Sequence, residues 1–270
     1  MLLVQGAADE LASQGQAAED DLVLAREASA FYLKLAESLL AQTPGHLKLA
    51  EAVSSGFGQY AFAFVASEAE RLEATDAKAA QKLRERAARL YLRGHRHAMA
   101  ALEQTSPGFR EALSRPEPDR WPRLTDAQVG VAYWAAATWG GHIALSKDHP
   151  DIVADLPMAI RLATLAWNRS PDHAEGGLSS LMGNFELARP GGSRAQALSY
   201  FDRAIAAAGG RSAAPLVAKA EGIALPAGDR PAFEALLRQA LAVSQTGRDL
   251  SNELMRERAQ WLLDTAGDLF

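Results

Sequence analysis

Three segments in the second half of the chain repeat one spacing of small and aromatic residues, and this repetition limits the fold more than any other feature. Each segment places such residues four and then three positions apart, which is the spacing of one face of an α-helix. The three sets are Ala159, Ala163 and Ala166; Ala197, Phe201 and Ala204; and Phe233, Leu237 and Ala240. Corresponding positions recur after 38 residues and then after 36. Such a period predicts a series of similar helix pairs.

Tetratricopeptide repeats carry small and aromatic residues at these positions of their second helix. A small residue lets the next helix approach, and an aromatic ring fills the remaining groove. The observed period exceeds their usual length of about 34 residues, and alanine-rich helices give similar matches by chance. The pattern therefore indicates either degenerate tetratricopeptide repeats or a general array of helical hairpins. Both predict an all-α fold of antiparallel helix pairs, stacked as a tetratricopeptide-like α-solenoid or bundle with almost no strand.

The remaining sequence also predicts helices separated by short loops. Apolar residues recur at helical spacing from Asp20 to Gln42, and Pro44-Gly45 ends that run. Four prolines between Thr105 and Thr125 predict a turn region with at most short helices. We expect an N-terminal extension over residues 1–18, the remnant of a tether, and a single helical repeat domain over residues 19–270. The expected helices cover residues 20–42, 46–73, 77–103, 125–147, 151–169, 173–188, 193–208, 212–225, 231–244 and 248–268.

Composition excludes several classes of protein. The chain is 48% hydrophobic and carries a formal net charge of −5 with acidic and basic residues interspersed, which predicts a folded protein without a basic face for nucleic acid. The charged face of the helix from Asp76 to Glu103 is expected to be solvated. The most apolar stretch, residues 129–145, is interrupted by polar residues and falls short of the roughly 20 apolar residues of a membrane span. Absence of cysteine excludes disulfides, thiol catalysis and thiolate metal sites.

No motif for catalysis, a cofactor or a metal ion occurs, so we expect a noncatalytic protein without a cofactor. His95 and His97 lie two positions apart on a predicted helix and therefore point to different faces, whereas a helical metal-binding pair lies four apart. We interpret both as surface histidines. A Gly-x-Ser-x-Gly motif is absent, and the glycine-rich segments lack the spacing of a phosphate-binding loop. Adjacent carboxylates such as Asp20-Asp21 lie at helix starts, where we expect them to cap free amides.

Two segments, residues 54–65 and 133–142, combine aromatic residues with glycine inside predicted helices. Glycine in a helix costs about 1 kcal/mol relative to alanine, so something should compensate. Close helix packing against Gly140 and Gly141 is one explanation. The other is an aromatic-lined cavity or pore with a few polar groups. Its candidate lining residues are Phe57, Gln59, Tyr60, Phe64, Tyr133, Trp134, Trp139 and His142.

Several short stretches, in order along nearly the whole chain, carry a family resemblance. They include residues 20–40, GFGQYAFAFV at 56–65, RLYLR at 89–93, SPGF at 106–109, YW to WG at 133–140, LSKD at 145–148, RPGGS at 189–193 and AQWLL at 259–263. Together they resemble the T-component family associated with TRAP solute transporters. The resemblance implies a periplasmic, lipid-anchored scaffold of tetratricopeptide-like helix pairs that forms a trimer and binds the transporter's solute-binding protein. It also implies a pore through which a small organic acid or hydrophobic solute passes.

One departure from that family is the absence of any cysteine, since its members carry a lipid-attachment cysteine after a signal peptide. We expect the signal and the cysteine to precede this sequence. Two other functions stay open at this stage. One is a generic adaptor that grips a peptide or protein on a concave face, with no solute passage. The other is an all-helical enzyme using Tyr60, Gln59 and His142, for which no acid–base pair is evident.

Overall fold

The computed structural model describes residues 2–14, 21–246 and 249–270, and within these ranges the chain is helical with no strand. The all-α prediction is therefore confirmed for the described residues. The chain divides into two compact units, one of Met1–Gln16 with Arg26–Arg169 and one of Ala17–Ala25 with Ser170–Phe270. Stacking as a solenoid, and the division into an extension over 1–18 and one domain over 19–270, stay predictions.

The N-terminal part of the chain consists of helices, of which α2 and α5 start at a capping aspartate. They are α1 (Leu2–Gln14), α2 (Leu22–Gln42), α3 (Leu47–Tyr60), a π-helix (Ala61–Ala66), α4 (Ser67–Leu72) and α5 (Ala77–Thr105). The Asp21 carboxylate accepts from the backbone amides of Val23 and Leu24, and the Asp76 carboxylate accepts from the amide of Ala79 at 2.9 Å. Both caps agree with the helix starts expected from the sequence.

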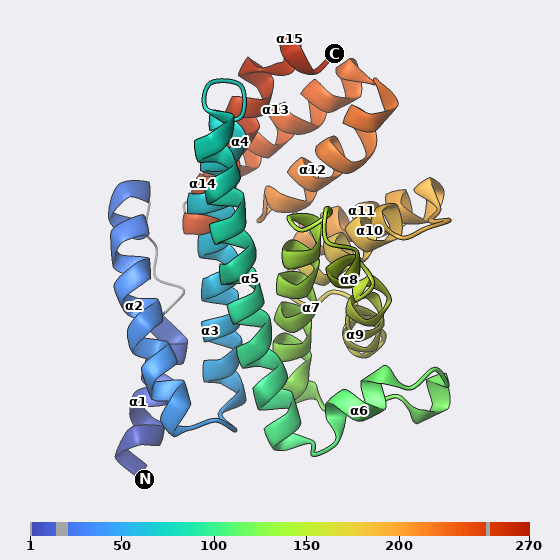
Figure 1. Ribbon diagram of the computed structural model, residues 1–270. Coiled ribbons are helices and arrows are strands. Elements are labelled where there is room, and N and C mark those ends of the chain that lie inside the picture. The colour runs from blue at the N-terminus through green and yellow to red at the C-terminus, as the bar shows by residue number, and fades with distance from the viewer. Residues whose placement is uncertain (1, 15–20, 247–248) are drawn as a thin grey trace. The chain divides into compact units, whose positions relative to one another are not determined.

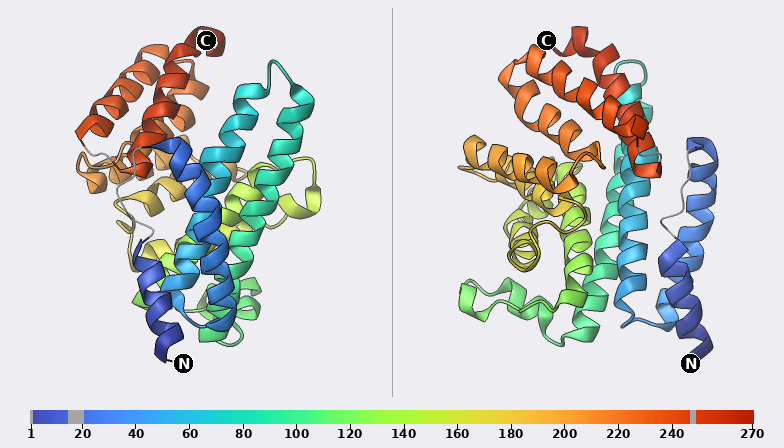
Figure 2. Two further views of the ribbon diagram at one scale, coloured as in Figure 1. Left: turned by 90° about the vertical axis from the view of Figure 1, so that its left-hand side faces the viewer. Right: turned by 180° about the vertical axis from the view of Figure 1, so that it is seen from behind.

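The first unit continues through the proline-rich segment into a buried helix. Only short helices interrupt residues 106–128, namely α6 (Phe109–Ser114) and 3₁₀ turns at Pro118–Arg120 and Asp126–Gln128. Thr125 and Gln128 form a capping box before α7 (Val129–Ala144). Then follow α8 (Pro150–Val153) and α9 (Leu156–Arg169), so the helix expected over 151–169 is split by a turn. Figure 1 shows α2, α3, α5 and α7 side by side in that order, and the view from behind in Figure 2 agrees.

The second unit consists of shorter paired helices. They are α10 (Gly177–Ala188), α11 (Arg194–Ala208), α12 (Ala214–Lys219), a π-helix (Ala220–Ala224), a 3₁₀ turn (Leu225–Ala227), α13 (Arg230–Thr246), α14 (Leu250–Asp264) and α15 (Ala266–Leu269). Helix α10 packs on α11, and α13 packs on α14. Helix α10 starts four residues later than expected, because Ala174, Glu175 and Gly176 adopt positive φ angles.

The repeated positions found in the sequence all point into the cores of the units. Each of the nine residues at the repeated positions has no exposed surface: Ala159, Ala163 and Ala166 on α9; Ala197, Phe201 and Ala204 on α11; and Phe233, Leu237 and Ala240 on α13. Small residues occur at these positions because neighbouring helices approach closely there. Gly183 on α10, for example, lies so near the Phe201 ring that an added Cβ would come within 2.9 Å of it.

Candidate functional site

The two glycine and aromatic segments meet at one junction of three helices. Gly94 on α5 faces both, since a Cβ added there would lie 3.0 Å from the carbonyl oxygen of Ser54, 3.1 Å from the Cβ of Phe57 and 3.2 Å from the Cγ2 of Thr138. Gly58 on α3 in turn lies against Thr138. Helices α3, α5 and α7 approach closely here because glycine keeps the contact surface free of side chains.

In the second segment, residues 133–142, a glycine also allows close contact between helices. A Cβ added to Gly141 would come within 2.7 Å of the Tyr91 ring on α5. The loss of helix propensity at this position is therefore compensated by close packing, as the first of the two explanations predicted.

The candidate lining residues occupy different environments around this junction. Phe57, Tyr133 and Trp139 are buried, whereas Tyr60, Phe64, Trp134 and His142 are half-buried and Gln59 is exposed. Ring contacts join two pairs of residues within the same segment. The ring centroids of Tyr60 and Phe64 lie 5.4 Å apart, and those of Tyr133 and Trp134 lie 4.9 Å apart. The exposed Gln59 does not join the buried aromatic groups. A lining role for all eight residues stays a prediction.

A π-helical turn lies within the first segment. Over Ala61–Ala66 the backbone widens, and both the amide and the hydroxyl of Ser67 donate to the carbonyl oxygen of Phe62, the hydroxyl at 2.9 Å. Such turns insert a residue into an α-helix and occur frequently at functional sites. Helical periodicity gave no sign of this turn. Its only signal in the sequence was the unusual mixture of glycine, serine and aromatic residues.

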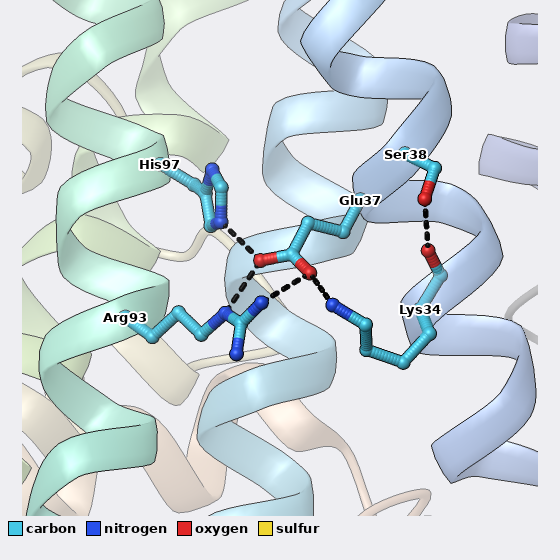
Figure 3. Close-up of polar contacts among 5 residues, drawn as sticks. All are labelled: Lys34, Glu37, Ser38, Arg93 and His97. Atoms are coloured by element: carbon cyan, nitrogen blue, oxygen red, sulfur yellow. Dashed lines mark hydrogen bonds and ion pairs between the residues drawn. The ribbon is translucent and has the colours of Figure 1, made fainter.

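A buried carboxylate, Glu37 of α2, lies at the centre of a polar cluster in the first unit (Figure 3). Arg93 of α5 donates to it through Nε at 2.5 Å and Nη2 at 2.6 Å, and Nε2 of His97 lies 2.7 Å from its Oε1. Lys34 of α2 completes the cluster. Sequence reasoning missed this site, because its partners lie on different helices and no local motif joins them.

Phe57 connects the Glu37 cluster to the three-helix junction. The guanidinium carbon of Arg93 lies 5.1 Å from the centre of the Phe57 ring, and the His97 ring stacks on the same residue at 5.9 Å. The buried candidate residue is thus covered by two of the side chains that bind Glu37. Any change at Phe57 should therefore be transmitted to α2.

Hydrogen bonding sets the charge of Glu37. Burial alone raises the pKa of its carboxyl, but the hydrogen bonds from Arg93, Lys34 and His97 outweigh burial and lower the pKa to about 2. The group is consequently ionised throughout the neutral and mildly acidic range. An ionised Glu37 holds α2 to α5 by charge-assisted hydrogen bonds.

The prediction that His95 and His97 are surface residues is wrong. His97 binds Glu37, and the ring of His95 lies 4.3 Å from that of Trp139. His95 Nδ1 donates to the carbonyl of Ala135 on α7, while Nδ1 of His142 on α7 donates to the carbonyl of Ala88 on α5, each at 3.0 Å. These reciprocal bonds join α5 to α7.

Both of these histidines are neutral near pH 7. Burial lowers the pKa of His95 to about 4, and burial also lowers the pKa of His142. A neutral imidazole suits the donation of one hydrogen bond to a backbone carbonyl. We interpret both side chains as structural links at this junction.

A second acidic residue lies against the start of α7. Both carboxylate oxygens of Glu51 lie 2.2 Å from where a Cβ would stand on Gly130, so a side chain at this position would displace the Glu51 carboxylate. Burial raises the pKa of Glu51. Burial and, secondarily, the charge of Glu51 raise the pKa of Tyr133 to about 12. Tyr133 thus remains a neutral phenol next to a half-buried acid.

Two features are absent from the described residues and limit the kind of site. Within residues 2–14, 21–246 and 249–270, no three His, Asp or Glu side chains gather as metal ligands would. The helices described there include none with the length and apolar character needed to cross a membrane. The site is thus an aromatic and glycine junction bordered by a charged cluster.

Comparison with known proteins identifies the family. The family model described as TRAP transporter T-component matches residues 18–270. A protein of Treponema pallidum (strain Nichols), described only as uncharacterized, is 31% identical over 265 residues, which cover 93% of this chain and 81% of that protein. The match extends through both compact units, so the chain belongs to the TRAP transporter T-component family.

Proposed function

We propose that the chain is a noncatalytic periplasmic scaffold that binds the solute-binding protein of a TRAP transporter. The observation that carries this proposal is the family match over residues 18–270. The proposal includes assembly as a homotrimer and a lipid anchor attached ahead of this sequence. It also includes tetratricopeptide-like stacking of the helix pairs, which would offer the extended surface that such repeats use to bind proteins.

The rigid packing of the first unit supports a scaffold. Helices α3, α5 and α7 are fixed by glycine contacts at Gly58, Gly94 and Gly141 and by the reciprocal hydrogen bonds of His95 and His142. A preorganised surface binds a partner without a large loss of conformational entropy. Binding is tested by titrating the purified solute-binding protein into the chain in a calorimeter. The proposal predicts saturable binding, and no heat of binding would refute it.

We further propose that a small organic acid or hydrophobic solute passes through a pore lined by the aromatic candidates. Those candidates are Phe57, Tyr60, Phe64, Tyr133, Trp134, Trp139 and His142, with Gln59 at the exposed surface. The π-turn at Ala61–Ala66 supports this part, since a local irregularity in a helix is retained more often where it serves a function.

Substitution of Ala63 by Trp tests solute passage, because Ala63 is a half-buried residue within the π-turn. The matched control is Ala100→Trp on an exposed position of α5. Passage predicts that Ala63→Trp abolishes uptake while the circular dichroism spectrum and partner binding stay unchanged. Equal loss of folding would show that the segment serves packing alone.

A generic adaptor that binds a protein or peptide without solute passage is the second candidate. The compact glycine contacts around Gly94 support it, since they leave the helices that carry the aromatic segments in close contact. Under this function Ala63→Trp leaves uptake unchanged as long as the protein folds.

A further inference from the structure

Helix α5 carries a continuous stripe of basic side chains on its exposed face. Successive members are four, four, three, four and three positions apart, so they lie along one side of the helix. With a rise of 1.5 Å per residue the stripe is about 27 Å long. It consists of six exposed residues: Lys78, Lys82, Arg86, Arg89, Arg93 and Arg96. The even mixing of charges expected from the sequence does not hold on this face.

Most of these charges have no acidic partner among the described residues. Arg93 binds Glu37, and Arg86 lies over the Tyr60 ring at 6.0 Å. The other four, Lys78, Lys82, Arg89 and Arg96, form no ion pair within the described ranges. Glu85 lies within this row, three residues after Lys82 and four before Arg89, but its carboxylate accepts a hydrogen bond from Gln81 and forms no ion pair with either of them.

Helix α13 also carries arginines on one face, but there an acidic residue neutralises their charges. There Glu234 stands between Arg230 and Arg238 and pairs with both, at 2.7 Å and 2.6 Å. Like charges four residues apart destabilise a helix by about 0.2–0.5 kcal/mol per pair. On α5 a single acidic residue, Glu85, stands in the row and pairs with none of the basic residues, so much of this repulsion remains and an acidic partner would relieve it.

The stripe concentrates positive charge on one face of a chain whose net charge is negative. The formal net charge is −5, so the residues outside these six sum to −5 − 6 = −11. Four of the six are arginines, whose planar guanidinium groups bind carboxylates in a bidentate way and are enriched in protein interfaces. Such a positive face attracts a negatively charged partner from a distance.

The character of the face favours a protein over a lipid surface. The large apolar side chains that are exposed in the described residues lie on other elements, for example Phe31 on α2 and Leu187 on α10, and none lies on α5. Stable insertion into a lipid interface requires exposed apolar or aromatic groups beside the basic ones. A straight basic ridge without them fits an acidic protein surface.

We propose that the α5 basic stripe is the docking surface for an acidic face of the transporter's solute-binding protein. This inference rests on the proposed function, because it names where that partner binds. Since the charges lie at an exposed surface, they act mainly on the rate of association and on its dependence on salt.

The test compares two double variants with the same change of charge. Arg89→Glu with Arg96→Glu reverses two unpaired members of the stripe, whereas Lys48→Glu with Lys147→Glu reverses two exposed lysines elsewhere in the first unit. Association with the solute-binding protein is measured by surface plasmon resonance at low and physiological salt. The stripe variant should associate about tenfold more slowly at low salt, and the control should stay within about twofold of the wild type.

The outcomes distinguish failure of the α5 docking surface from failure of the proposed function. Equal rates for all three proteins would overturn the docking surface while leaving the proposed function intact. A wild type that does not bind the solute-binding protein would refute the proposed function, and this inference with it. Circular dichroism and light scattering establish that the variants are folded. Loss of self-association in the stripe variant, or stripe-dependent binding to phosphatidylglycerol vesicles without an effect on the protein partner, would also overturn the inference.

Discussion

Replacement of Glu37 by Gln should destabilise the protein in a way that depends on pH. The pKa of this carboxyl is about 2 in the folded chain against an ordinary value of 4.5. That difference corresponds to at most about 3 kcal/mol of stability. Arg93 and Lys34 are each about half exposed, with side chains 46% and 60% accessible, so solvent screening reduces the figure. We expect Glu37→Gln to lower the free energy of unfolding by about 1–3 kcal/mol at pH 7.

The sign of the pH dependence follows from the depressed pKa. A carboxyl with a lowered folded pKa contributes its full stability above the unfolded pKa of about 4.5 and loses it as the pH falls through about 2. Urea unfolding at pH 7, 5 and 3 measures the difference between wild type and variant. It should be nearly constant from pH 7 to 5 and clearly smaller at pH 3. Glu27→Gln, on an exposed position of the same helix, is the control. A loss that is the same at all three pH values would refute the reasoning.

Three further predictions concern stability; the first two are checked by thermal and urea unfolding and the third by limited proteolysis. Gly94→Ala should cost about 1–2 kcal/mol, because the added methyl group meets the Ser54 carbonyl and the Phe57 side chain, whereas Gly6→Ala, with nothing within 4 Å, should be neutral or stabilising. An unchanged Gly94→Ala protein would contradict the close junction. Asp76→Ala should cost about 1 kcal/mol by removing the cap of α5. Arg161→Met should loosen residues 113–121, since Arg161 donates to two backbone carbonyls there; unchanged proteolysis of that segment would contradict this.

Local signals in the sequence predicted most of the helices. The caps at Asp21 and Asp76, the capping box at Thr125 and the proline-rich turn lie where residue types indicate them. These features depend on interactions between neighbours in the chain, so spacing and composition are sufficient to find them. The buried repeat positions, such as Phe201, follow from the same local periodicity.

Features that depend on tertiary contacts could not be predicted in this way. Glu37 and Arg93 are 56 residues apart, and no pattern within either helix indicates that they meet. The surface interpretation of His95 failed for the same reason, because its partners Ala135 and Trp139 lie on another helix. The basic stripe of α5 was not predicted either, because acidic and basic residues are interspersed along this sequence and only the structure shows which charges remain unpaired.

Under the proposed function, the packing of the first unit would keep its binding surface rigid. The glycine junction around Gly94 holds α3, α5 and α7 in one arrangement, and the Glu37 cluster fixes α2 to α5. A rigid helical layer can then present the charged face of α5 to a partner. Solute passage would require the aromatic side chains near Phe57 to open a path through the same layer.

The measurement that tests the central claim most directly is size-exclusion chromatography with multi-angle light scattering. It is made on the protein alone and on its mixture with the solute-binding protein of the same transporter. We predict a trimer that takes up the solute-binding protein and elutes with it as a larger complex. A monomer that elutes unchanged in the presence of the solute-binding protein would contradict the account.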